Sequence, residues 1–88
     1  MKFLGYTIGL ECNGHGRVGV LTKIEIHEDG DELIRLQPVS GRNLAPMPGE
    51  KLISRAKYDQ LPRDPLNDAK RAIALMELCG FTPMALDR

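Results

Sequence analysis

An alternation of apolar and polar residues between Arg17 and Gln37 constrains the fold of this chain more than any other feature. Every second residue from 18 to 26 is β-branched: Val18, Val20, Thr22, Ile24 and Ile26. This period of two is typical of a strand with one buried face. The turn Glu28-Asp29-Gly30-Asp31 and a second β-rich run, 33–36, follow, so the sequence predicts a β-hairpin. Because an isolated hairpin is only marginally stable, other segments must pack on it.

Further strands are predicted on both sides of the hairpin. Residues Phe3 to Glu11 have strand periodicity, and the turn cluster 12–16 joins them to the hairpin as an antiparallel neighbour. Residues 51–54 suit an edge strand, and 55–60 suit a helical turn. The loop 38–49 between them holds three prolines and two glycines. Long loops in small domains are often functional, so this loop is a candidate binding element.

A C-terminal helix is predicted for residues 64–80. Asp64 suits the N-cap and Pro65 suits the first helical position. Apolar residues three to four positions apart form one stripe: Leu66, Ala69, Ile73 and Met76, widened by Ala72, Leu75 and Cys79. Gly80 can adopt the left-handed conformation that ends a helix, and Phe81 would then contact Met76, as in a Schellman motif.

These elements predict an α+β, mainly β fold for a single domain of residues 1–88. The expected architecture is a small SH3-like or partly open antiparallel barrel, or a curved sheet of about four strands, with the C-terminal helix packed on it. The β-rich module covers 1–55 and the helix 64–80. The run Gly16-Arg17-Val18-Gly19-Val20 leading into Ile24, followed by a tight turn and a further strand, resembles SH3-like small barrels at the level of fold. Since such barrels host many activities, the resemblance implies no function.

The charge of the chain is balanced overall but uneven along the sequence. Twelve basic and twelve acidic residues leave no general attraction to nucleic acid or to an anionic membrane. Residues 38–63 nevertheless carry five basic residues against two acidic ones, Glu50 and Asp59. This segment is where an anionic partner is favoured.

The cysteines and the apolar segments predict a cytoplasmic protein with reduced thiols. Cys12 and Cys79 lie far apart and do not form a disulfide framework. The apolar run from Phe3 to Leu10 is too short and too interrupted for a signal peptide. No apolar stretch approaches the roughly 18–20 residues that span a membrane.

The sequence also contains patterns associated with cofactors and metals, but their context is wrong. Gly14-His15-Gly16-Arg17-Val18-Gly19 matches G-x-G-x-x-G, yet it opens a predicted strand where a dinucleotide site requires a helix. Four side chains are potential zinc ligands: Cys12, His15, His27 and Cys79. The two histidines lie at opposite ends of a strand that rises about 3.3 Å per residue, too far apart for one site. We therefore predict no cofactor and no metal.

No catalytic constellation is evident either. Cys12 with His15, and Ser40 with His27, each lack an orienting third group. The acidic residues of the hairpin turn lack the EF-hand pattern. We therefore predict that the chain is not an enzyme.

Binding is the function that these observations favour. The first hypothesis is a non-enzymatic protein-interaction module, a free-standing accessory or inhibitor protein that docks on another protein, alone or as a small homo-oligomer. A phage or mobile-element origin fits its size. The alternative is binding of nucleic acid, a nucleotide or another anionic small molecule through residues 38–63. This alternative ranks second because the chain has only four aromatic residues on which bases could stack and its net charge is zero. The candidate binding residues are Arg17, Arg42, Asn43, Leu44, Met47, Lys51 and Arg55.

Overall fold

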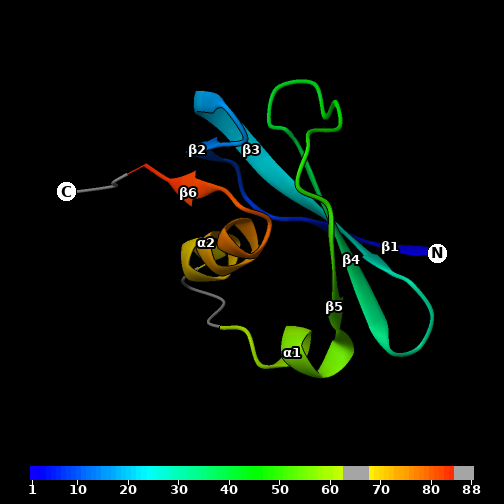
Figure 1. The fold of residues 1–88 in the computed structure, drawn as a ribbon. Helices are drawn as coiled ribbons and strands as arrows, with labels where there is room; N and C mark the ends of the chain where they lie inside the picture. Colours follow the sequence, from blue (N-terminus) through cyan, green and yellow to red (C-terminus); the bar gives the residue numbers. More distant parts are fainter. Residues whose placement is uncertain (63–67, 85–88) are drawn as a thin grey trace.

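A twelve-residue strand, β3 (Arg17–Glu28), is the axis of an antiparallel sheet. One edge of β3 pairs with β4 (Leu33–Ser40), and β5 (Lys51–Ser54) pairs with β4 in turn. The other edge pairs with two strands in succession, β2 (Leu10–Gly14) and β1 (Lys2–Tyr6). The computed structural model describes residues 1–62 and 68–84, and over these ranges β6 (Thr82–Pro83) pairs with β2 to complete six strands (Figure 1).

The predicted hairpin is confirmed, but its second strand is longer than expected. β4 continues through Pro38, where the sequence predicted the start of a loop. The carbonyl of Pro38 accepts a hydrogen bond from the backbone N–H of Met47 (2.9 Å), on the side away from β3. The nitrogen and carbonyl of one strand residue face the same way, so this proline removes no hydrogen bond from the β3–β4 ladder.

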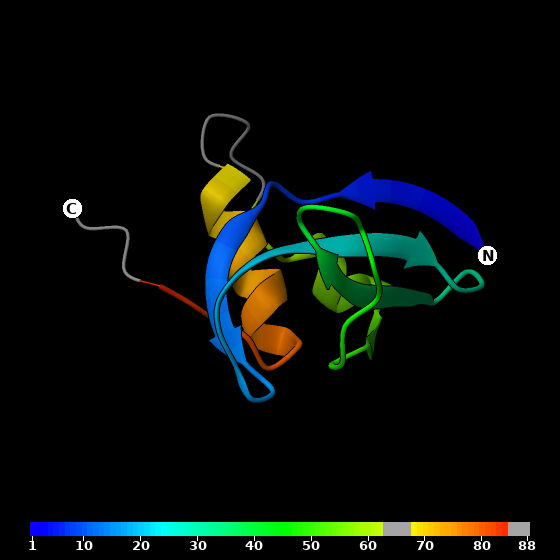
Figure 2. The ribbon, with the colours of Figure 1, turned by 90° about the horizontal axis from the view of Figure 1, so that it is seen from above.

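The first predicted strand is divided in two at residues 7–9. Thr7 donates its backbone N–H to the carbonyl of Ile24 (3.0 Å), and its hydroxyl oxygen accepts from the N–H of Ile24 (3.0 Å). The hydroxyl therefore replaces a backbone carbonyl in the ladder while the chain changes direction. Beyond this corner β2 curves over α2, whereas β1 extends away from it (Figure 2).

The turn between β2 and β3 is tighter than the predicted cluster at 12–16. Strand β2 extends to Gly14, and His15 and Gly16 alone form the turn, with φ angles of 51° and 80°. Positive φ at both central residues is the requirement of a type I′ hairpin turn, whose twist matches that of the flanking strands.

The C-terminal helix is confirmed as α2 (Asp68–Leu78), which packs in the concave face of the curled sheet (Figure 2). It ends as predicted: Gly80 has a φ of 87°, its N–H donates to Glu77, and the N–H of Phe81 donates to Met76 (2.9 Å). The expected cap at Asp64-Pro65 lies outside the described residues. Ile73 is only half-buried, so the stripe is centred on four other residues: Ala72, Leu75, Met76 and Cys79.

The predicted fold class is confirmed. The short helix α1 (Arg55–Asp59) occupies the predicted helical turn, where the hydroxyl of Ser54 accepts from the N–H of Lys57 (3.0 Å). The described residues form six strands where the sequence predicted about four, because the first strand is broken and β6 was not anticipated. Among those residues, no helix has the length and apolar character needed to cross a membrane.

Truncation of the helix core should be costly. Leu75 is fully buried among the core residues of the sheet. We expect Leu75→Ala to lower the free energy of unfolding by about 2–5 kcal/mol, through lost apolar contacts and the cavity left behind. Urea denaturation checks this. The matched control is Glu77→Ala on the exposed side of the same helix, expected to stay within about 0.5 kcal/mol of the wild type. Equal losses in the two variants would contradict the packing of α2 described above.

Candidate functional site

The structure places the seven predicted binding residues in different environments. Arg17, Arg42, Asn43 and Leu44 are exposed, in the β2–β3 hairpin and in the loop after β4. Met47 is buried in the core, and its carbonyl accepts from the side-chain amide of Gln37 (2.9 Å). It therefore anchors the loop.

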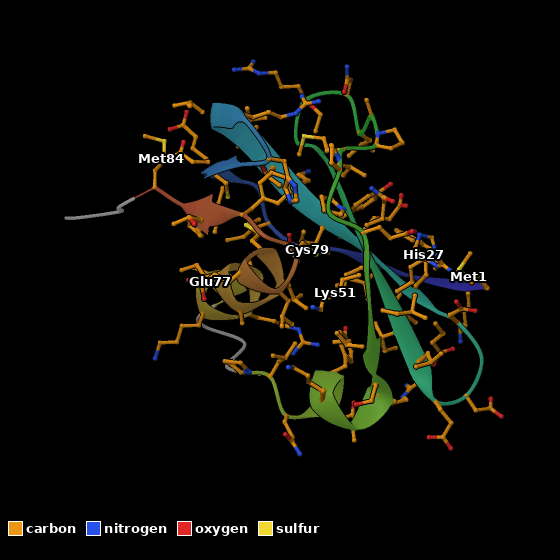
Figure 3. All side chains as sticks on the ribbon, in the orientation of Figure 1. Met1, His27, Lys51, Glu77, Cys79 and Met84 are labelled. Atoms are coloured by element: carbon orange, nitrogen blue, oxygen red, sulfur yellow. The ribbon has the colours of Figure 1, made fainter. Side chains whose placement is uncertain are left out.

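Lys51 and Arg55 are held close to other elements of the fold. Lys51 is exposed but lies opposite Leu36, on the face of the sheet that packs against α2, and Figure 3 shows it beside Cys79. The guanidinium of Arg55 forms an ion pair with Glu28, and this hydrogen bond holds the pKa of Glu28 below its usual value. The hairpin thus supplies acidic partners that neutralise part of the basic middle segment.

Arg35, on strand β4, is neutralised by acidic partners in the same way as Arg55. Arg35 donates to Asp29 (2.7 Å) and to Glu50 (2.9 Å), and these hydrogen bonds raise its pKa. Two carboxylates of the hairpin turn, Glu28 and Asp29, are therefore engaged with cations of the fold.

The residues weighed for metal or thiol chemistry have structural partners. Cys79 is buried, and burial raises the pKa of its thiol to about 11. His15 donates from Nε2 to the backbone carbonyl of Cys79 (2.9 Å), an oxygen at the helix C-terminus that lacks a partner within the helix. Cys12 donates to the sulfur of Met76 (3.4 Å). The described residues contain no group of three or more side chains positioned to hold a metal ion.

Exposed apolar side chains are concentrated at the N-terminal end of the chain. Half of the ten exposed large apolar residues of the described chain occur within residues 1–8: Met1, Phe3, Leu4, Tyr6 and Ile8. Phe3 and Tyr6 are 49% and 41% exposed. β1 pairs with β3 on one side only, and no strand of the described ranges pairs with its other edge. An unpaired edge with apolar side chains is a template for another strand.

On the convex face of the sheet, a small polar cluster lies next to this apolar surface. Register places Phe3 opposite His27, and Tyr6 opposite Glu25. Glu25 accepts hydrogen bonds from the Tyr6 hydroxyl (3.1 Å) and from Nε2 of His27 (2.9 Å), and the Phe3 ring contacts both aromatic neighbours. Burial, the hydrogen bond and the nearby carboxylate charge raise the pKa of Tyr6. Met1 and His27 mark this end of the sheet in Figure 3.

A cavity lies on the opposite side of the same edge, between the corner after β1 and α2. It has a volume of about 170 Å³ and six lining residues: Tyr6, Thr7, Ile8, Ile26, Arg71 and Ala72. Arg71 lies over the ring of Tyr58, 4.5 Å from its centroid, and donates from Nη1 to the carbonyl of Pro62 (3.1 Å). The β1 edge therefore has aromatic rings on one side and, on the other, a cavity whose lining includes Arg71.

Comparison with known proteins adds no family or relative: no protein-family model, curated protein or solved structure matches this chain.

This site differs from the one predicted from the sequence: none of Phe3, Tyr6 and Arg71 is among the seven predicted binding residues. From Phe3 to Leu10, the large apolar residues fall on the even positions, and Phe3 is the exception among the odd ones. This alternation is the pattern of a strand with one buried face, so it gave no signal that the surface is open.

The burial of Cys79 predicts an unreactive thiol. Raising its pKa from 9.0 to about 11 lowers the thiolate fraction at pH 8 about hundredfold, and only the thiolate is nucleophilic. Iodoacetamide labelling with peptide mapping should therefore show much slower modification of Cys79 in native protein than in guanidinium chloride. The same shift favours the folded state below about pH 9, and this contribution is lost as the pH rises towards 11. Fast native labelling would restore thiol chemistry as a hypothesis.

Proposed function

We propose that this chain is a non-enzymatic protein-interaction module that docks an extended segment of another protein along the open edge of β1. The observation that carries the proposal is the unpaired edge of β1 within the described residues, together with its exposed apolar side chains. In this mode of recognition, backbone hydrogen bonds supply affinity and alternate side chains supply specificity.

The two sides of the edge support this mode. Successive side chains of a docked strand point to opposite faces of the sheet. One set would lie against Phe3 on the convex face, and the other would point towards the cavity beside Thr7. A strand at this position would thus extend the sheet and cover apolar surface that is now exposed.

The same observations support binding over catalysis. Glu25 and His27 form a hydrogen-bonded pair, and neither residue lines the cavity beside β1. The two free, buried cysteines fit the reduced cytoplasmic environment that we propose for the protein. An accessory or inhibitor role follows from docking without chemistry.

A matched pair of double variants tests the docking edge. Phe3→Lys with Leu4→Lys places two charges on β1, and Leu33→Lys with Leu52→Lys places two on the β4–β5 side of the sheet, starting from similarly exposed residues. We expect the β1 variant to lose at least about tenfold in capture of a protein partner from native lysate, as for a hot-spot loss of more than 1.4 kcal/mol. The control should capture as the wild type does.

The capture is performed at low and high salt, after circular dichroism shows that both variants are folded. A partner bound through apolar contacts and backbone hydrogen bonds should be retained at high salt. Equal capture by the two variants would refute the β1 site. Co-purified nucleic acid that is released by salt and depends on Arg42 would favour the alternative, binding through the basic segment.

A further inference from the structure

We propose that the cavity beside β1 is an anchor pocket for one acidic side chain of the docked segment, with Arg71 as its recognition residue. This inference rests on the proposed docking and adds the chemistry that the partner must supply. It assigns a role to the cavity and a second role to an arginine that already contacts Tyr58 and Pro62.

The lining of the cavity combines aliphatic surface with the polar side chains of Tyr6, Thr7 and Arg71. Ile8, Ile26 and Ala72 supply aliphatic surface. The hydroxyl of Thr7 is already used, because it donates to the carbonyl of Ile8 (2.9 Å) and accepts from the N–H of Ile24. The hydroxyl of Tyr6 donates to Glu25 (3.1 Å), so we assign ligand recognition to Arg71, the charged residue of the lining.

The guanidinium of Arg71 has more donors than its hydrogen bonds to the described residues use. It carries five N–H donors, and its bond to Pro62 uses one of them. No carboxylate of residues 1–62 or 69–84 forms an ion pair with Arg71, in contrast to Arg35 and Arg55. Its planar fork matches the two oxygens of a carboxylate.

The size of the cavity suits a single side chain. Its volume of about 170 Å³ is close to the roughly 150 Å³ of a cavity that holds one benzene molecule. Sites for drug-sized ligands and cofactors range from about 300 to 1,000 Å³, so this cavity is smaller than a site that encloses a nucleotide. A glutamate side chain combines an aliphatic stem for the lining with a carboxylate for Arg71.

The charge of β1 argues against a second copy of this chain as the occupant. The sequence of β1, KFLGY, contains Lys2 and no acidic residue. Pairing of two β1 strands would therefore supply no carboxylate to either Arg71. A segment of a different protein, with a glutamate among apolar residues, meets the requirement.

The test uses three small probes and amide chemical shifts measured by NMR. The probes are capped glutamate (N-acetyl, N-methylamide), capped glutamine of the same shape, and N-acetyl-leucine, whose carboxylate is a chain terminus. We expect capped glutamate to shift the amides of Thr7, Ile8 and Ala72, with a dissociation constant about tenfold lower than that of capped glutamine. Arg71→Met should remove this preference, and Lys70→Met, an equal change of charge on the adjacent residue, should preserve it.

Several results would overturn the assignment. Equal binding of capped glutamate and capped glutamine, or no shift of these amides, would refute a carboxylate pocket on wild-type protein alone, even if Arg71→Met failed to fold. Preferred binding of N-acetyl-leucine would assign the pocket to a chain terminus. The outcome is independent of the lysate experiment. If the β1 variant loses the partner but the wild type does not bind the probe, docking is supported and the pocket is refuted. If the wild type binds the probe but the β1 variant captures the partner normally, docking along β1 is refuted.

Discussion

The burial of the concave face of the sheet against α2 is the interaction on which the rest of the structure depends. The sheet alone is a curled ribbon with an apolar face, and α2 supplies the second layer that this face requires. Side-chain contacts at both ends of α2 hold the helix in place. Arg71 links its first turns to α1 and Pro62, whereas the carbonyl of Cys79 at its other end accepts from His15.

One short helix cannot cover a sheet built on a strand as long as β3, and this shortage creates the candidate site. Helix α2 has eleven residues and packs beneath β2 and the central part of the sheet (Figure 2). β1 diverges from the helix after the corner at Thr7, so that its edge and convex face stay open and a cavity remains beneath the corner. The candidate site thus follows from the small size of the core, whose longer helix, α2, leaves part of the sheet uncovered.

Local patterns were sufficient for the elements with strong periodicity or strong end signals. The β3–β4 hairpin and the Gly80 helix end follow from contacts close in sequence, and both are confirmed. The corner at Thr7 could not be predicted, because it depends on a side-chain hydrogen bond to Ile24, seventeen residues away. The ion pair of Arg55 could not be predicted either, because its partner Glu28 precedes the hairpin turn whereas Arg55 follows β5.

The sequence by itself determined the mainly β class, the hairpin and the helix that packs on it, because periodicity and capping act over a few residues. Only the tertiary structure decided which surface stays open. Residues 1–8 carry five exposed large apolar side chains, and their exposure depends on where α2 ends its coverage. The cavity likewise exists only because β1, its corner and α2, more than sixty residues apart in the chain, meet without filling the space between them.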